Sequence, residues 1–429
     1  MSVTSTLRIL SSLLMSVALL MLGHGVFSTF LALRASMEGF GNDVVGWIAS
    51  AYYIGLIAGT FKCGALVNRI GHIRAFAAFS AISAASMLAF ALFVHPAAWI
   101  ALRIILGFNL AGLYMVTESW LNARATSETR GKVLSIYMTI TYLALTGGQF
   151  LINTADVASS ALFIVSAVML VLSLVPVALT RSSHPEPVES SYMSLRALFA
   201  VSPVAAVGCI AGGVILGSMF GMGPIYAKEL GMDTRGISFF MGIAVVAGLF
   251  TQVPVGHLSD RFDRRSVIVA ITIGSALMAL ALVFQHKLNF VPTYLWIALY
   301  GGLTATLYPL CVAYANDYLE PGQVVAASSS LVFAFGIGAA AGPTAAAIAM
   351  RYYGPGGLFL LSFAICLIYT AFIIYRMRIR HWAPVVEKDP YVPMPEVIAT
   401  PLASEIDPRA EVDFRYDFTD EGEPRDAAT

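Results

Sequence analysis

The sequence predicts an all-α integral membrane protein whose twelve transmembrane helices form two related six-helix bundles. Of its 429 residues, 58% are hydrophobic and 12% are charged, roughly half the charged fraction usual in soluble domains. The apolar residues form long continuous runs, and runs of about 18 or more residues are typical of transmembrane helices. A short charged pattern also occurs twice, at 64–74 and 256–265, which indicates an internal repeat.

Each apolar run is long enough to cross a bilayer core of about 30 Å at about 1.5 Å per residue. The first run is too long for the apolar part of a signal peptide, so we interpret it as a transmembrane helix. The expected spans are 9–33, 44–66, 75–94, 98–120, 133–153 and 159–180 in the first half, and 199–227, 236–257, 267–286, 293–316, 325–350 and 357–377 in the second.

Basic residues in the short loops predict the orientation, because Lys and Arg accumulate in cytoplasmic loops. With the N-terminus placed in the cytoplasm, fourteen basic residues fall on the inner side and five on the outer side. Both termini are therefore expected in the cytoplasm, and the chain is expected to be a multi-pass protein of the cytoplasmic (inner) membrane.

Composition also predicts the domain organisation. The polar stretch 181–197 is expected to be a cytoplasmic linker between two bundles, 1–180 and 198–380. Residues 381–429 hold twelve acidic residues, four basic residues and seven prolines, a composition that cannot bury a core and predicts a disordered acidic tail. A partner-binding role for this tail is the alternative. The four cysteines lie in predicted spans without a C-x-x-C pair, so we expect packing residues and neither disulfides nor metal ligands.

The repeated charged pattern is expected to gate the cytoplasmic side. Each copy has a glycine at the end of the second helix of its half and an Asn-Arg or Asp-Arg pair in the following loop. Glycine lets helices approach closely, and an Asp at a helix end can face the N-terminal amides of a neighbouring helix. In a two-fold repeat, Asp260 should face the start of the fifth helix and Asn68 the start of the eleventh. The predicted gating residues are Gly64, Asn68, Arg69, Gly256, Asp260, Arg261 and Arg130.

These residues carry a family resemblance. The stretch GHLSDRFDRR at 256–265 resembles the loop signature of the major facilitator superfamily, and the similarity in hydropathy and repeat covers residues 9–380. Arg103-Ile-Ile-Leu-Gly107 is similar to the Arg-x3-Gly element of that superfamily. The stretches 224–265 and 308–346 resemble its uncharacterised YcaD-like branch. The resemblance implies transport by alternating access and, for Arg103, a role in proton coupling or helix locking.

Two features depart from the superfamily pattern. Asn68 stands where an Asp is expected in the first loop. Gly338-x3-Gly342-Pro343, in the eleventh span, is similar to the glycine-proline element of antiporters, which usually lies in the fifth span.

Three ionisable residues within the spans are candidates for proton coupling, since such groups are costly in a membrane. They are Arg103, Glu118 and His24. Glu118 could be a protonatable carboxylate, or it could form a salt bridge with basic residues at the membrane edge. His24 could exchange protons near neutral pH, or it could be a hydrogen-bonded core histidine. Arg103 and Glu118 lie fifteen residues apart on one helix, about 22 Å along its axis, so they cannot pair directly.

A polar face on the fifth helix predicts a water-filled path. Six polar residues, Ser135, Thr139, Tyr142, Thr146, Gln149 and Asn153, fall within an arc of about 80°, and lipid would not satisfy them. Hydrogen bonding between helices is the alternative. The tenth helix has a weaker polar face, and Tyr308 corresponds to Tyr114 by pseudo-symmetry. The predicted substrate-cavity residues are Tyr114, Tyr142, Thr146, Gln149, Tyr300, Thr304 and Tyr308.

No nucleotide-binding, zinc-protease or nucleophile-elbow motif occurs in the sequence, so neither an enzyme nor a cofactor is expected and transport should use a gradient. We predict a secondary active transporter for a small, partly apolar organic solute, coupled to protons and leaning to efflux. A non-transporting receptor or scaffold and a proton-coupled uptake symporter are the alternatives. The expected partners are the bilayer, the solute and protons, with no nucleic acid, and the chain is expected to be a monomer.

Overall fold

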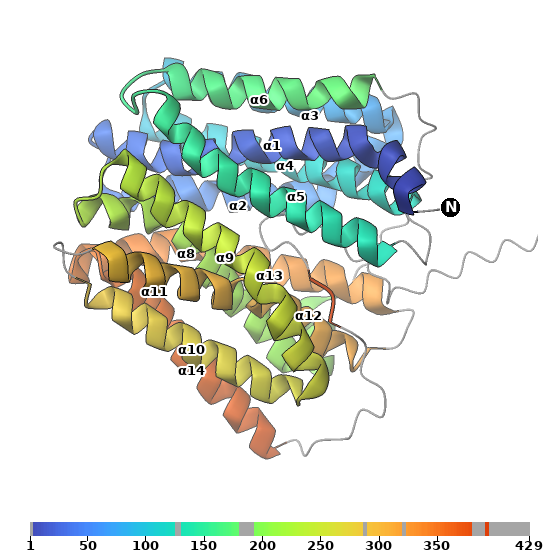
Figure 1. Cartoon of the computed structure of the whole chain (residues 1–429), viewed down its shortest axis with the longest axis vertical. Helices are drawn as coiled ribbons and strands as arrows, with labels where there is room; N and C mark the ends of the chain where they lie inside the picture. Colours follow the sequence, from blue (N-terminus) through green and yellow to red (C-terminus); the bar gives the residue numbers. More distant parts are fainter. Residues whose placement is uncertain are drawn as a thin grey trace, which may run out of the picture.

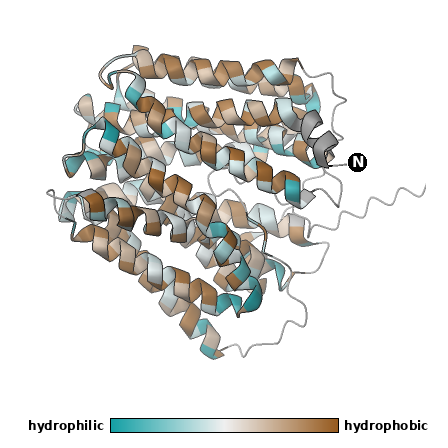
Figure 2. Ribbon diagram, in the orientation of Figure 1, coloured by the Kyte–Doolittle hydropathy of each residue, from teal (hydrophilic) through white to brown (hydrophobic). Residues whose placement is uncertain are grey.

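The predicted fold class is confirmed by the computed structural model, which describes residues 3–124, 130–179, 193–285, 290–319, 323–379 and 391–393. Twelve segments of the described chain are long and apolar enough to cross a membrane. Helices α1–α6 form one layer of the molecule and α8–α14 the other (Figure 1). Apolar residues cover the middle of the helices, and hydrophilic residues gather at helix ends, most densely where α9 meets α10 (Figure 2).

The described residues of the first half form six long helices and one short turn. They are α1 (Val3–Met37), α2 (Asn42–Ile70), α3 (His72–Leu92), α4 (Pro96–Arg124), α5 (Arg130–Leu151), the 3-10 turn η1 (Ile152–Thr154) and α6 (Ala161–Ala178).

The described residues of the second half form eight helices. They are α7 (Leu195–Val201), α8 (Pro203–Glu229), α9 (Thr234–Arg261), α10 (Arg264–Val283), α11 (Phe290–Thr304), α12 (Leu307–Asn316), α13 (Val324–Tyr353) and α14 (Gly357–Ile379).

Two spans are divided differently from the prediction. The tenth span is broken into α11 and α12, because Pro309 has no N–H to donate to the carbonyl of residue 305. At the break, the Thr306 hydroxyl donates to the Leu303 carbonyl at 2.7 Å. The start of the seventh span belongs to a separate helix, α7, which is capped by the Ser194 hydroxyl. Pro203 occupies the first turn of α8, where its missing N–H costs nothing.

Glycines bring equivalent helix pairs together in the two halves. A methyl group at Gly338 would lie 2.0 Å from the Ile210 carbonyl oxygen, and one at Gly342 would lie 2.4 Å from that of Val214, both on α8. In the first half, a methyl group at Gly25 of α1 would lie 2.6 Å from an α5 carbonyl oxygen. Because the eleventh span corresponds to the fifth in a two-fold repeat, the glycine-proline element of α13 lies in the seam equivalent to α1–α5.

The two halves contact each other at the end of the bundle opposite to the start of α1, which the basic-residue rule predicts to be the outer end. There the Lys228 ammonium donates to the Ser36 hydroxyl at 2.8 Å, and the Asn42 amide donates to the Glu229 carboxylate at 2.9 Å. The hydroxyls of Ser50 and Thr344 also lie 2.8 Å apart. These polar contacts hold the predicted outer end closed in this structure.

The linker and tail expectations concern segments of which only part is described. Residues 180–192, 380–390 and 394–429 lie outside the described residues, and the predicted disorder of the tail falls on them. Within the tail, residues 391–393 are described, and Tyr391 and Val392 are buried against the rest of the protein.

Candidate functional site

Two of the predicted coupling residues, Arg103 and His24, line one cavity. It has about 370 Å³ of empty space and receives side chains from α1, α2, α4, α5 and α8. Its lining residues are His24, Ser28, Ala49, Tyr52, Tyr53, Arg103, Leu145, Phe220 and Gly221.

Arg103 is a buried cation surrounded by aromatic rings. Its side chain is 6% exposed, and its guanidinium carbon lies 4.8 Å from the centre of the Tyr52 ring and 5.7 Å from that of Phe27. Within the described part of the chain, its Nε and Nη1 atoms have no hydrogen-bond partner, and no carboxylate forms an ion pair with it. Cation–π contacts contribute about 0.5–2 kcal/mol each, well below the several kcal/mol that burying a charge costs.

Close packing of α2 against α4 places Arg103 over Tyr52. A methyl group at Gly107 would lie 2.0 Å from the Tyr52 carbonyl oxygen, and one at Gly55 would lie 2.1 Å from that of Ile104. Only glycine permits this separation of the two backbones. The glycine of the Arg-x3-Gly element therefore positions the arginine that precedes it.

His24 lies beside Arg103 and Tyr52 in the same cavity. Its ring centre is 5.4 Å from that of Tyr52, and the residue is 3% exposed. Its Nδ1 atom is buried without a hydrogen-bond partner among the described residues. The structure thus brings together three groups, Arg103, His24 and Tyr52, that come from three different helices.

Glu118 lies in a separate part of α4, nearer the predicted cytoplasmic end. Its side chain is fully buried, and it accepts a long hydrogen bond of 3.5 Å from the hydroxyl of Tyr137 on α5. The side chains of Arg124 and Arg130, two of the basic residues at the membrane edge, lie outside the described residues, so the salt-bridge alternative for Glu118 stays a prediction. Sequence reasoning missed its neighbour His72, which is 4% exposed and hydrogen bonded to the Ser119 hydroxyl at 2.8 Å.

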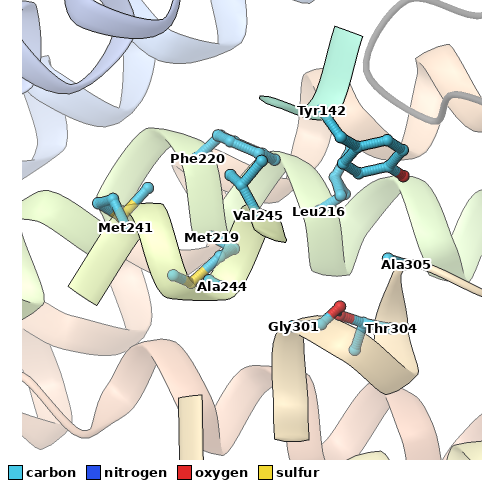
Figure 3. A pocket seen from close by; sticks show the side chains of 10 residues that line it. All are labelled: Tyr142, Leu216, Met219, Phe220, Met241, Ala244, Val245, Gly301, Thr304 and Ala305. Carbon is cyan, nitrogen blue, oxygen red and sulfur yellow. The ribbon is translucent and has the colours of Figure 1, made fainter. Parts of the chain in front are cut away.

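A second cavity, of about 460 Å³, lies between α8, α9 and α11 and is closed on one side by α5 (Figure 3). Tyr142 and Thr304, two of the predicted cavity residues, line it together with mostly apolar neighbours, which are Leu216, Met219, Phe220, Met241, Ala244, Val245, Gly301 and Ala305. The Tyr142 hydroxyl accepts a hydrogen bond of 2.8 Å from the Gln252 amide. Phe220 lines both cavities, so the two hollows share this side chain as a wall.

The other predicted cavity residues lie in helix seams. Gln149 is fully buried, with its amide oxygen 2.5 Å from the Thr29 hydroxyl and its amide nitrogen 3.1 Å from the Gly25 carbonyl oxygen. Its polarity therefore serves α1–α5 packing in this structure. The Tyr300 hydroxyl donates to the Ser362 hydroxyl at 2.9 Å.

Three further predicted cavity residues line neither hollow. Tyr308 packs edge-on against Phe335 with ring centres 5.0 Å apart. Tyr114 is 1% exposed, and the Thr146 hydroxyl is buried without a hydrogen-bond partner among the described residues.

The predicted gating residues have unequal environments in the two halves. In the first half Asn68 and Arg69 are exposed at the end of α2, and a methyl group at Gly64 would meet only the Met115 sulfur, at 3.4 Å. In the second half Arg261 is exposed, whereas Asp260 forms contacts described below. The side chain of Arg130 and all of residues 125–129 lie outside the described residues, so the predicted facing of Asp260 and the fifth helix stays a prediction.

The junction of α9 and α10 in the second half contains a buried ionic network that sequence reasoning missed. The Arg264 guanidinium is 1% exposed and donates to the Ala313 carbonyl at 2.5 Å and to the Asp317 carboxylate at 2.8 Å. It also lies 3.4 Å from the Asp260 carboxylate. The signal was present in the sequence, since Arg264 belongs to the repeated pattern, but the positive-inside rule predicted only loop anchoring.

Comparisons with known proteins agree with this architecture. The family model described as Major Facilitator Superfamily matches residues 13–284 and 226–406. The chain is 30% identical over 366 residues to the uncharacterised MFS-type transporter YcaD of Salmonella newport, which covers 84% of this chain and 94% of that protein.

Two solved structures share the fold at low sequence identity. The nucleoside transporter NupG matches with a TM-score of 0.73 at 13% identity, over 87% of this chain and 100% of that chain. The D-xylose-proton symporter matches with a TM-score of 0.69 at 15% identity, over 90% and 100%. With twelve spans, the repeated loop pattern and these matches, the chain belongs to the Major Facilitator Superfamily of transporters.

Proposed function

We propose that this protein is a secondary active transporter that moves a small organic solute by alternating access, exchanges it against protons and drives it out of the cell. It acts as a monomer in the cytoplasmic membrane, with both termini in the cytoplasm. Two bundles, 1–180 and 198–380, form the transporting body, joined by the linker 181–197.

The pair of cavities that share Phe220 is the observation that supports this proposal most directly. One cavity is lined mainly from the first half and the other mainly from the second. The two cavities hold about 460 and 370 Å³ of empty space. A solute held between two six-helix halves is exposed to one side or the other when the halves rock.

Proton coupling is supported by titratable groups buried in the same half. His24 faces the cavity beside Arg103. Glu118 is fully buried on the same helix as Arg103, nearer the predicted cytoplasmic end. Ionisable residues inside transporters commonly form proton relays. In the proposed mechanism Glu118 takes up and releases the proton, while Arg103 and His24 respond to the solute.

The outward direction is supported by the glycine-proline element of α13. Gly338 and Gly342 allow α13 to lie against α8, and the resemblance of this element to that of antiporters favours exchange of solute for protons. An uptake symporter would use the same residues with solute and proton moving together.

Reconstitution tests the proposal. Profiling of metabolites and drugs in cells with and without the protein selects solutes, and proteoliposomes loaded with a pH-sensitive dye are then exposed to them. We expect solute addition to change the internal pH, and expressing cells to hold less of that solute. Higher cellular levels would favour the uptake symporter. No pH change and no solute movement across the panel would favour the receptor or scaffold.

A further inference from the structure

We propose that the transported solute is an organic anion with a carboxylate head that binds Arg103 and an apolar body that extends past Phe220. This inference rests on the proposed transport function and names its substrate class. The cavity around Arg103 holds a buried positive charge that no described carboxylate balances.

The charge balance of the cavity favours an anion over a cation or a neutral solute. A carboxylate at Arg103 would supply the missing counter-charge, and the planar guanidinium suits a bidentate carboxylate. The unpaired Nε and Nη1 atoms are the donors for this contact. A cationic solute would instead add a second positive charge to the same buried space.

The shape and lining of the two cavities favour an apolar body on this anion. Tyr52, Tyr53 and Phe220 surround the cavity of Arg103. Beyond Phe220, the second cavity is lined by Met219 and Met241 with few polar groups, and methionine adapts to varied apolar shapes. Figure 3 shows Met219, Met241 and Phe220 around this apolar hollow.

Binding to the purified full-length protein tests the substrate class. The probes are matched triads in which only the head differs: 4-phenylbutyrate, its amide and 4-phenylbutylamine, and naphthylacetate with its amide and amine. Affinity is measured from ligand-dependent thermal stabilisation in detergent. Because hydrogen bonds to charged groups contribute about 1.5–3 kcal/mol, we expect the carboxylates to bind at least about tenfold more tightly than their amides.

Variants assign the effect to the arginine. Arg103→Gln should lower carboxylate affinity to that of the amide and leave amide affinity unchanged, and Arg103→Lys should retain part of the preference. Arg196→Gln, an exposed arginine on α7, is the matched control. If the amides or amines bind as tightly as the carboxylates or more tightly, or if no probe binds, the inference is overturned. Both outcomes are measured on the unmodified protein, so they hold even if Arg103→Gln fails to fold. Transport of neutral or cationic solutes would leave the proposed function standing.

A second inference rests on a different observation, the return of the tail to α9. The Tyr391 backbone N–H donates to the Asp260 carboxylate at 2.8 Å. The Tyr391 ring lies over Gly256, where a methyl group would be 2.3 Å from a ring carbon. Tyr391 and Val392 are 9% and 7% exposed. The equivalent glycine of the first half, Gly64, has no such cover within the described residues.

We infer that residues 391–393 act as a brake by holding Asp260 away from the closing contact of the predicted cytoplasmic end. One carboxylate oxygen accepts the Tyr391 N–H and faces Arg264. The ring of Tyr391 occupies the surface above Gly256 that a neighbouring helix would need for close approach. Release of residues 391–393 then frees both the carboxylate and the glycine surface for closure.

Distance measurements test this brake without any solute. Spin labels are placed at residues 66 and 258, which are exposed near the ends of α2 and α9, in a full-length chain with its four cysteines replaced by alanine. Tyr391→Ala should shift the distance distribution toward shorter values. Tyr375→Ala, an exposed tyrosine of α14, should change nothing.

Hydrogen exchange shows separately whether the segment is docked. Peptides covering 256–262 should exchange faster in Tyr391→Ala than in the unmodified chain. Unchanged exchange would show that the tail does not cover α9 and would overturn the inference. Faster exchange without a shift in distances would overturn it as well, because docking would then have no effect on closure.

Discussion

In the first half of the molecule the buried charges lie along one helix, α4, whereas in the second half they lie where the start of α10 meets the end of α12. Arg103 and Glu118 are buried within α4. In the second half the helices around the cavity are apolar, and the buried charged side chains among the described residues include Arg264, Arg265 and Asp317. The two halves therefore differ in where their buried charges lie: in the proposed mechanism the first half contacts solute and proton, whereas the second half contains an ionic clamp.

Equivalent positions of the repeat make the difference sharper. With the 192-residue offset between Gly64 and Gly256 (256 − 64), His72 corresponds to Arg264. His72 is hydrogen bonded to the Ser119 hydroxyl at 2.8 Å, and Arg264 is paired with the Asp317 carboxylate at 2.8 Å. At this position the first half has a hydrogen bond between α3 and α4, whereas the second half has an ion pair between α10 and the residue that follows α12.

The largest expected effect is on coupling. Glu118→Gln removes the protonatable group, so movement driven by a pH gradient should fall about tenfold or more while solute exchange is retained. Both are measured in proteoliposomes. Asp317→Asn should leave the ratio of the two activities unchanged, because it lies in the second half. Equal loss of both activities in Glu118→Gln would remove this residue from the proton path and weaken the division between the halves.

The next effect is on stability. Asp317→Asn leaves the buried Arg264 without its closest carboxylate, and removing one partner of a buried pair costs about 3–5 kcal/mol. Unfolding free energy in mixed detergent micelles is the measurement. Asp43→Asn is the control. Its ion pair with Arg351 is exposed, since the Asp43 side chain is 43% and the Arg351 side chain 67% exposed, and such pairs contribute about 0–1 kcal/mol. Similar costs for the two variants would contradict the clamp.

A smaller effect concerns the glycines that both halves use. Gly107→Ala should cost about 1–3 kcal/mol of unfolding free energy, because the methyl group would lie 2.0 Å from the Tyr52 carbonyl oxygen. Gly64→Ala is the matched control, with its nearest contact at 3.4 Å, and it should be neutral or slightly stabilising. Gly338→Ala should behave as Gly107→Ala does. A tolerated Gly107→Ala would show that the α2–α4 seam can open.

The sequence predicts the fold better than the site for a physical reason. Long apolar runs and the loop repeat follow from the bilayer alone, so the twelve spans could be read directly. A polar residue on a helix face, however, is satisfied either by water or by a neighbouring helix, and the sequence does not distinguish these. Gln149 illustrates this, since it binds α1, whereas Tyr142 on the same face lines a cavity.

Contacts between distant segments were also beyond sequence reasoning. Arg103 and His24 were each recognisable as costly buried groups, but their meeting with Tyr52 depends on how α1, α2 and α4 pack. The ion pair of Arg264 joins residues 53 positions apart, and the docking of Tyr391 on Asp260 joins residues 131 apart. Neither pairing has a periodic signature.

The smallest expected effect concerns His72, the first-half equivalent of Arg264. It tests whether the hydrogen bond of His72 contributes less to stability than the ion pair of Arg264. Ser119→Ala removes a hydroxyl that lies 2.8 Å from His72 Nε2, and a neutral hydrogen bond contributes about 0.5–1.5 kcal/mol to stability. Ser119→Ala should therefore lower the unfolding free energy much less than Asp317→Asn does. The two changes are comparable because Ser119 is the partner of His72 and Asp317 is the partner of Arg264, the equivalent residue. Unfolding free energy measured under the same conditions gives the comparison. If Ser119→Ala costs as much as Asp317→Asn, the first half also contains a charged clamp, because loss of a neutral hydrogen bond alone cannot supply that free energy. The contrast between the halves would then lie in their cavities and not in their loops.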